Sequence, residues 1–317
     1  MTEKKKETKT TPANEEPIEA SVVTEEEDAS MAMTPYTQAL TVARTTLMDE
    51  LTVLRDKADG DDKALLQRLC RACDPVKKGR EEISNRWSLP TIRIVQNMTK
   101  DKPEGSKVGD LYTSSGATLK TPFKCTPLYI YEVNRMFPAQ GMKAPVCIAP
   151  DAKLGNTFGA CDKCINLPLG KNATNQSTDC DNGVCFIVLG ENMRMYRLEF
   201  FRTSKKAGNK IVNMTEDWDN IWEQWVSVGS KEVSNDAGNS YHIFTVGAHG
   251  DIVAPALQEA IEVLYDMVIA ERKARLKEHW DAAMSGDKAA GDVDESIDAD
   301  KVEVTDGSDN PDLAGKF

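Results

Sequence analysis

Residues 185–201 read CFIVLGENMRMYRLEFF, a stretch in which two apolar runs flank a short turn. The runs are Cys185–Leu189 and Met193–Phe201, and Gly190-Glu191-Asn192 lies between them. Strand-forming residues on both sides of a glycine-containing loop are typical of a β-hairpin. This part of the chain is therefore predicted to form paired strands.

Further strands are predicted on both sides of this hairpin. The segments with alternating or branched apolar residues are Thr91–Gln96 (TIRIVQ), Thr126–Met136 (TPLYIYEVNRM), Pro145–Ile148, Ile221–Val228 and Tyr241–Val246. A short helix is expected at Ser204–Thr215, before the last pair. Five or six strands with a helix in this position favour a small closed barrel of the OB type. A β-sandwich is the alternative, and the strand pattern does not separate the two.

Helices are predicted on either side of the strand-rich region, which makes the fold class α+β. The first begins near Pro35, and its apolar side chains recur every three or four residues: Leu40, Ala43, Leu47, Leu51 and Leu54. A second covers Asp61–Cys73, and a long third helix covers Ile252–Ala283. The apolar stripe of the first helix is expected to pack on its own domain, with a partner chain as the alternative. In the second case these helices would serve homo-oligomerisation.

The two ends of the chain differ from its middle in composition. Residues 1–33 contain nine acidic residues and four lysines, and residues 285–317 contain ten acidic residues and three lysines. Both lack the apolar surface that offsets the entropy of ordering, so they are predicted to be disordered acidic tails. The chain then divides into a tail 1–33, a helical segment 34–87, an OB-like core 88–250, a C-terminal helix 251–284 and a tail 285–317.

The charge of the core is opposite to that of the tails. The 317-residue chain has a net charge of −12, but residues 88–212 contain 17 Lys and Arg against 10 Asp and Glu. A basic body between acidic tails is compatible with binding to nucleic acid, although the acidic total alone argues against it. The chain contains no apolar run long enough to cross a membrane and no secretory signal at its N-terminus, so a cytoplasmic location is expected.

Five of the eight cysteines fall between residues 147 and 185. Cys161 and Cys164 have the Cys-x2-Cys spacing that brings two thiolates to one ion. The long polar segment around them is expected to be ordered only if a bound metal holds it in place. A structural Zn²⁺ held by Cys147, Cys161, Cys164 and Cys180 is therefore predicted within an insert at 147–185. Cys185 is the alternative fourth ligand, and reduced, unligated cysteines are the alternative to zinc. Cys70 and Cys73 are interpreted as buried thiols of a helix.

Cations and aromatic rings alternate in two of the predicted strand regions. This combination suits single-stranded nucleic acid, because cations follow the phosphates while rings stack on exposed bases. The predicted nucleic-acid-binding residues are Lys120, Lys124, Tyr129, Tyr131, Arg135, Arg194, Tyr196, Arg197, Phe201, Arg202, Lys205 and Lys206. Tyr129 and Tyr131 are favoured because Leu128 and Ile130 are expected on the opposite face, whereas Trp218, Trp222 and Trp225 are assigned to the core.

The order of these features resembles a group of tailed-phage single-stranded DNA-binding, or helix-destabilising, proteins. The resemblance covers roughly residues 88–248 and depends on TIRIVQ, GDLYTSSG, TPLYIYEVNRMF, the cysteine-rich insert, FIVL and LEFFRTSKKAGNKI. It implies an OB-like core with a zinc-stabilised insert and non-specific binding of single strands at replication forks. It also implies an acidic tail that regulates binding and meets replication proteins through a terminal Phe, here Phe317.

The sequence therefore predicts a protein without catalytic activity that coats single-stranded DNA during phage replication and recombination in the host cytoplasm. No paired acidic motif or histidine set indicates a nuclease. The alternative is a zinc-stapled virion or scaffold protein that binds other proteins. Such a protein would hold zinc but would not bind oligo(dT).

Overall fold

A computed structural model of the chain describes residues 35–73, 89–100, 102–136, 145–164, 180–235 and 238–285, without the side chains of residues 35–41. The predicted tail at 1–33 lies outside these residues, as does all of 285–317 except Ser285. Phe317, the predicted partner-binding residue, and positions 165–179 of the predicted insert also lie outside them.

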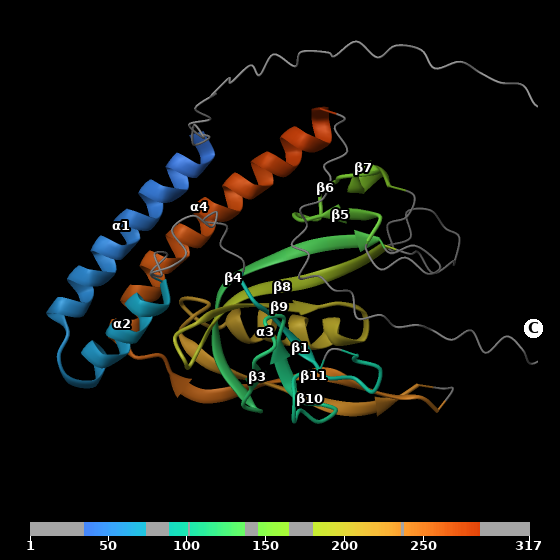
Figure 1. The fold of residues 1–317 in the computed structure, drawn as a ribbon, viewed down its shortest axis with the longest axis horizontal. Helices are drawn as coiled ribbons and strands as arrows, with labels where there is room; N and C mark the ends of the chain where they lie inside the picture. Colours follow the sequence, from blue (N-terminus) through green and yellow to red (C-terminus); the bar gives the residue numbers. More distant parts are fainter. Residues whose placement is uncertain are drawn as a thin grey trace, which may run out of the picture.

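Helices and strands occur in the order expected for an α+β fold (Figure 1). The helices are α1 (Pro35–Lys57), α2 (Gly60–Cys73), α3 (Lys205–Thr215) and α4 (Pro255–Ser285), with short 3-10 turns η1 (Cys161–Lys163) and η2 (Arg202–Ser204). The strands are β1 (Thr91–Ile94), β2 (Leu111–Thr113), β3 (Thr118–Leu119), β4 (Phe123–Met136), β5 (Cys147–Ala149), β6 (Leu154–Gly155), β7 (Gly159–Ala160), β8 (Cys180–Gly190), β9 (Met195–Phe200), β10 (Gln224–Ser234) and β11 (Ser240–Ile252).

The main sheet is mixed and curls into a half-barrel. Its strand order is β11-β10-β4-β8-β9-β1-β2-β3, and β5 pairs with the end of β4. Neighbouring strands are antiparallel except β1 and β9, which are parallel. Strands β6 and β7 form a separate two-stranded sheet. The predicted α+β class is confirmed, with a curled sheet that is compatible with a barrel-like core.

The edge strand β11 is covered by side chains instead of a further strand. The Gln96 amide forms two hydrogen bonds with the His242 backbone: its Nε2 donates to the carbonyl at 2.8 Å, and its Oε1 accepts from the N–H at 2.9 Å. Farther along, Lys210 Nζ donates to the Val246 carbonyl at 2.8 Å. These contacts satisfy edge groups that would otherwise be available for pairing with another chain.

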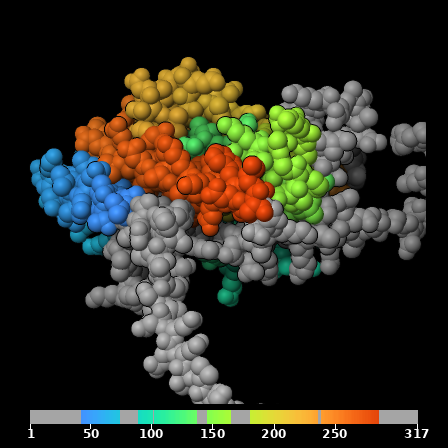
Figure 2. All heavy atoms as spheres, turned by 90° about the horizontal axis from the view of Figure 1, so that it is seen from above, coloured from blue at the N-terminus to red at the C-terminus, as the bar shows by residue number. Residues whose placement is uncertain are grey.

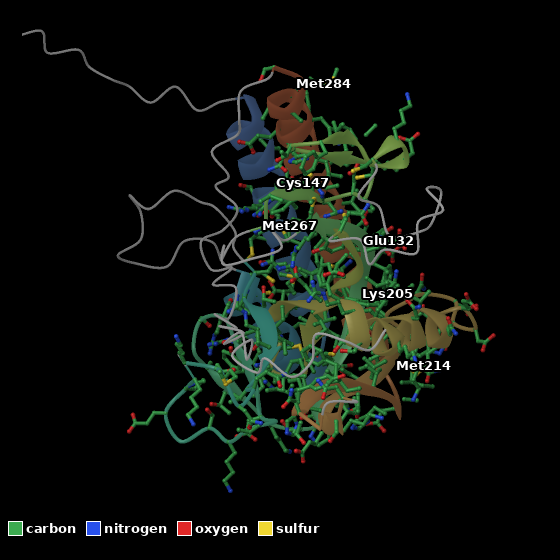
Figure 3. All side chains as sticks on the ribbon, turned by 90° about the vertical axis from the view of Figure 1, so that its right-hand side faces the viewer. Glu132, Cys147, Lys205, Met214, Met267 and Met284 are labelled. Atoms are coloured by element: carbon green, nitrogen blue, oxygen red, sulfur yellow. The ribbon has the colours of Figure 1, made fainter. Side chains whose placement is uncertain are left out.

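Helices pack on both faces of the sheet and bury two apolar clusters. Helix α3 covers one face, where Gly208 allows a close approach because a Cβ there would lie 2.9 Å from Phe200 Cβ. Helices α1, α2 and α4 enclose the second cluster together with Leu128 and Leu189 of the sheet. Figure 3 shows Met267 of α4 and Met214 of α3 on opposite sides of the sheet.

The apolar stripe of α1 packs on its own chain, as the sequence indicated. Leu47 and Leu51 are buried in the cluster that contains α4, and Figure 2 shows α1 and α4 side by side. An ion pair joins the two helices, with Arg44 Nη2 3.8 Å from Glu271 Oε2. None of the helices in the described ranges is both long and apolar enough to cross a bilayer.

Strand β8 is longer than the sequence suggested, because it begins at Cys180 instead of Cys185. The added residues are polar, and they pair in register with the end of β4, where Asn182 lies opposite Asn134. Asn182 Nδ2 donates to Asn134 Oδ1 at 2.8 Å. These residues join the sheet through pairing with β4 and through this amide contact. They lack the apolar pattern by which strands are recognised in a sequence.

Candidate nucleic-acid interface

Strands β4, β8 and β9 place three side chains in one row across the sheet. Tyr131 lies opposite Cys185, and Cys185 lies opposite Glu199 on the next strand. Side chains alternate along a strand, so this row lies on the face toward α4, while Ile130 packs beside Phe186 on the α3 face. The row forms the centre of the candidate site.

The prediction that Leu128 shares a face with Ile130 is wrong. The register between β4 and β8 shifts between Pro127 and Tyr129, so one residue of β4 is unmatched at this point. As a result Leu128 and Tyr129 both join the cluster beneath α4. A bulge of this kind changes the face of a side chain without leaving a pattern in the sequence.

Glu199 is a largely buried carboxylate to which two arginines bind. Arg135 Nη1 and Nη2 donate to its two oxygens at 2.8 and 2.7 Å, and Arg197 Nε lies 3.2 Å from Oε1. The Glu199 side chain retains only 13% of its exposure. Burial alone would raise the pKa of Glu199, but the charges of Arg135, Arg197 and Arg93 together hold that pKa below its usual value.

Helix α4 adds a fourth cation to this face of the sheet. The guanidinium carbon of Arg272 lies 3.7 Å from the centroid of the Tyr131 ring and 5.6 Å from that of Tyr129. Its Nη2 also donates to the Pro150 carbonyl at 2.5 Å. Cation–π contact and the hydrogen bond fix the guanidinium over the rings. Burial raises the pKa of Tyr131, so its hydroxyl stays protonated at neutral pH.

Phe201 extends the aromatic surface beyond β9. The Arg135 guanidinium carbon lies 4.7 Å from the centroid of the Phe201 ring. The ring occupies space that Gly183 leaves open, because a Cβ at Gly183 would lie 2.4 Å from Phe201 Cε1. Arg135 is therefore held between a carboxylate and an aromatic ring, a geometry that keeps its fork in one orientation.

We call this set of side chains the arginine face. It consists of Arg93, Arg135, Arg197 and Arg272 with Tyr129, Tyr131, Phe201 and Glu199. Four guanidinium groups and one carboxylate give it a formal charge of +3. The charges of Arg135, Arg197, Arg272 and Glu199 all act on the thiol of Cys185, which lies buried beneath them.

The structure brings together five of the predicted nucleic-acid-binding residues: Tyr129, Tyr131, Arg135, Arg197 and Phe201. The others lie elsewhere. Lys124 is paired with Asp251 at 2.6 Å, Arg202 is paired with Asp181 at 2.5 Å, and Lys205 is bonded to Asn182. Tyr196 is buried on the α3 face in edge contact with Phe123. Lys120, Arg194 and Lys206 are exposed in turns or on α3.

Sequence reasoning missed two members of this face. Arg93 lies between Ile92 and Ile94 in the predicted strand TIRIVQ, and the alternation places it on the face opposite the two isoleucines. The sequence pattern does not show which residues of other strands lie beside Arg93. Arg272 belongs to a helix more than a hundred residues away in sequence, and only the tertiary fold brings it to β4.

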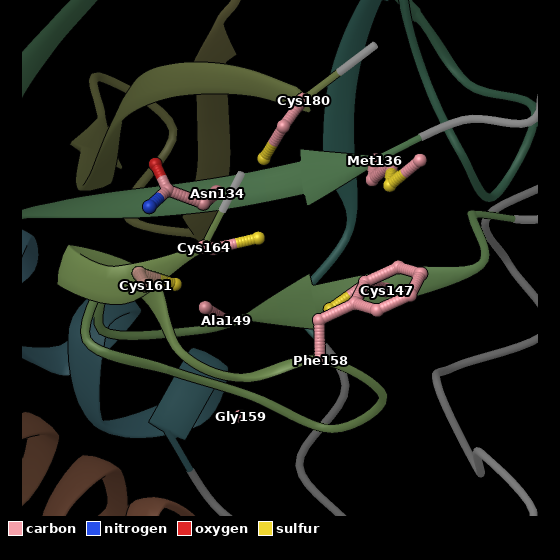
Figure 4. A pocket seen from close by; sticks show the side chains of 9 residues that line it. All are labelled: Asn134, Met136, Cys147, Ala149, Phe158, Gly159, Cys161, Cys164 and Cys180. Carbon is pink, nitrogen blue, oxygen red and sulfur yellow. The ribbon is translucent and has the colours of Figure 1, made fainter. Parts of the chain in front are cut away.

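The cysteines of the predicted zinc insert line one pocket. Cys147, Cys161, Cys164 and Cys180 surround it with Met136 and Phe158, as Figure 4 shows. Cys185 lies outside this pocket, under the arginine face. Burial raises the pKa of Cys161 and raises that of Cys180 to about 12, so both are neutral thiols near pH 7.

The prediction of a structural Zn²⁺ is wrong. Among the described residues, no group of three or more His, Cys, Asp or Glu side chains is arranged to hold a metal ion. Cys147 and Cys180 are carried by strands on opposite sides of β4, and both lie in register with Met136. Two strand spacings, about 9.5 Å, therefore separate their backbones, a distance that sequence spacing cannot indicate.

The remaining cysteine pair agrees only in part with its interpretation as buried thiols, because Cys70 is buried and Cys73 is half-buried. Cys70 is buried in the helical cluster, and its Sγ donates to the Leu51 carbonyl at 3.8 Å. Burial raises the pKa of Cys73 to about 12.

Comparison with known proteins finds no matching family model, no matching curated protein and no matching solved structure. The resemblance to phage single-stranded DNA-binding proteins therefore stays a prediction.

Proposed function

We propose that this chain binds single-stranded DNA through the arginine face, without catalysis, and that the half-barrel is an OB-like core. The observation that carries the proposal is the gathering of four arginines and three aromatic rings from β1, β4, α4 and the end of β9 around one carboxylate. Its biological setting, the replication and recombination of phage DNA, depends on the resemblance in sequence.

Arginine is suited to the phosphates of a nucleic-acid strand. The planar guanidinium can bind two oxygens of one phosphate, as Arg135 binds the two oxygens of Glu199. The face has a formal charge of +3, and the helix that borders it continues with the exposed cations Lys273 and Lys277. Each cation that neutralises a phosphate releases a counterion, so the proposed binding depends on salt.

The aromatic residues favour a single strand over a duplex. Tyr129, Tyr131 and Phe201 are half-buried residues whose rings lie beside the arginines. A base can stack on such a ring only when it is not stacked inside a duplex. Every base has a π-face, and little sequence preference is therefore expected.

Fluorescence anisotropy with labelled oligo(dT) tests the proposal. Three net cations predict a slope of log K against log salt of about −2, because each neutralised phosphate of a single strand contributes about −0.7. A duplex of equal length should bind more weakly. Equal affinity for the duplex, or affinity that does not change with salt, would refute the proposal.

A pair of charge-matched variants locates the binding site. Arg272→Gln removes a cation of the arginine face, whereas Lys63→Gln removes an exposed cation of α2. The first should weaken oligo(dT) binding and reduce the magnitude of the salt slope by about 0.7, and the second should leave both unchanged. Circular dichroism of both variants shows whether the fold is retained.

We also propose two roles for the acidic tails. The C-terminal tail binds replication proteins through Phe317, and the tails compete with DNA for the arginine face. Removing residues 285–317 should then tighten oligo(dT) binding at low salt, because the competing negative charge is lost. A truncated chain with unchanged affinity would separate the tail from DNA binding.

A further inference from the structure

The thiol pocket differs from the other places where this chain carries cysteine. Cys147 comes from β5, Cys161 and Cys164 from η1 and its end, and Cys180 from the start of β8. Cys161 and Cys180 each sense the charge of Cys147 and Cys164, and all four residues line the same pocket. Figure 4 shows the four side chains directed into the same pocket, with Phe158 beside Cys147.

Cys161 and Cys164 have the backbone geometry of a disulfide. The N–H of Cys164 donates to the carbonyl of Cys161 at 3.1 Å, which closes a turn of four residues. Such a turn keeps its first and last Cα atoms within about 7 Å, and disulfides span about 4.4–6.8 Å between Cα atoms. The two thiols can therefore join with little movement of the chain.

The other two thiols of the pocket cannot join directly. Cys147 and Cys180 flank β4 at about 9.5 Å, which exceeds the span of a disulfide. Gly155 also approaches the sulfur of Cys147 so closely that a Cβ there would lie 2.5 Å from it. The pocket thus contains one pair that can be oxidised and two thiols that stay apart.

We propose that Cys161 and Cys164 form a reversible dithiol–disulfide site that reacts with hydroperoxides. Cys164 is the half-buried thiol of the pair, so it meets the oxidant first. Its sulfur attacks one oxygen of hydrogen peroxide, the O–O bond breaks, and a sulfenic acid and one water result. The sulfur of Cys161 then attacks that sulfur, the S–S bond forms, and the second water leaves.

The overall reaction converts two thiols and one hydrogen peroxide into one disulfide and two waters. The two electrons come from the sulfur atoms and reduce the peroxide. Two equivalents of a low-molecular-weight thiol restore the two cysteine thiols by thiol–disulfide exchange and leave as their own disulfide. This site is independent of DNA binding, so its failure would not affect the proposed function.

The chain contains its own control pair. Cys70 and Cys73 have the same Cys-x2-Cys spacing, and each pair has one buried and one half-buried thiol. However, Cys70 and Cys73 both pack in the helical cluster, and burial raises the pKa of Cys73 to about 12, which leaves little thiolate to attack a peroxide. Spacing alone predicts that both pairs react, whereas the structure predicts that only Cys161 and Cys164 do.

The experiment treats the reduced full-length chain with one equivalent of hydrogen peroxide, alkylates the remaining thiols after unfolding, and maps the peptides by mass spectrometry. The expected result is a single disulfide between Cys161 and Cys164, with the other six cysteines alkylated. A chain in which all eight cysteines are alkylated, or one in which Cys70 and Cys73 are joined equally fast, would overturn the proposal. A bridge that contains Cys147 or Cys180 would also overturn it.

Two serine variants complete the test. Cys164→Ser should lose the disulfide, whereas Cys125→Ser, a change at a buried thiol in a different part of the sheet, should retain it. If Cys164→Ser does not fold, as judged by circular dichroism, Cys180→Ser replaces it, and the Cys161–Cys164 disulfide should still form. Loss of that disulfide in a folded Cys180→Ser chain would count against the proposal.

Discussion

Replacing Glu199 by glutamine tests how far its negative charge offsets the positive charge of the arginine face. The carboxylate is the negative member of a cluster in which Arg135 and Arg197 bind it directly and Arg93 acts on it through its charge. Glu199→Gln keeps an oxygen that can accept from Arg135, but it removes the charge. The formal charge of the face rises from +3 to +4.

Two effects of this substitution oppose each other. A negative charge about 4 Å from a bound phosphate repels it by about 4 kcal/mol at an effective dielectric constant of 20, and partial exposure and salt reduce this to roughly 1–2 kcal/mol. The variant also loses one of the two strong hydrogen bonds that position the Arg135 guanidinium, but its amide oxygen can still accept the other from Arg135. The charge effect should dominate, so the variant should bind oligo(dT) about tenfold more tightly at low salt.

The salt dependence gives a second readout of the same change. One more available cation makes the slope of log K against log salt steeper by about 0.7. Glu132→Gln is the matched control, because Glu132 is an exposed carboxylate of the same strand, β4, whose side chain alternates to the opposite face. This control should leave affinity and slope nearly unchanged.

The stability of the Glu199→Gln variant is expected to fall. The pKa of Glu199 is lowered in the folded state, so its carboxylate contributes stability above its unfolded pKa, and this contribution is lost as the pH falls through the folded pKa. Urea unfolding at neutral pH should show a loss of about 1–3 kcal/mol. A folded variant that binds oligo(dT) with wild-type affinity and slope would refute the reasoning.

Three further predictions concern other parts of the structure. Tyr131→Leu should weaken oligo(dT) binding by about 1–3 kcal/mol in anisotropy, because it removes a stacking ring, while Tyr131→Phe should bind as the wild type does; equal binding by the leucine variant would contradict this. Burial raises the pKa of Glu271 above its usual 4.5, so the folded state loses stability as the pH rises above that value. Glu271→Gln should therefore lose less stability between about pH 5 and pH 8 in urea unfolding, and an unchanged pH dependence would argue against it. Gln96→Ala should destabilise the fold by about 1–3 kcal/mol and speed hydrogen exchange at the His242 amide, because that edge group loses its partner; wild-type exchange there would show that Gln96 does not protect the edge.

Local patterns predicted most of the secondary structure, because the apolar positions that define them are close in sequence. The stripe of α1 is of this kind, and Leu47 and Leu51 are buried as the sequence indicated, whereas a bulge interrupts the alternation of β4 at Leu128. The polar start of β8 was missed, because Asn182 joins the sheet through pairing and an amide contact with Asn134 instead of through apolar burial.

The candidate site was predicted only in part, because its members come from distant segments. Tyr131, Arg135 and Arg197 belong to strand regions in which rings and cations alternate. Arg272 joins them only through the packing of α4 on the sheet. The zinc prediction failed for a related reason: spacing within the chain does not show that β4 lies between Cys147 and Cys180.

Photo-crosslinking tests the central claim most directly, because it shows which residues touch the bases. An oligo(dT) that contains 5-iododeoxyuridine is crosslinked to the full-length chain at low and high salt, and the modified peptides are mapped by mass spectrometry. The account predicts crosslinks on Tyr129, Tyr131 or Phe201 that disappear at high salt. Crosslinks confined to other parts of the chain, or none at low salt, would contradict it.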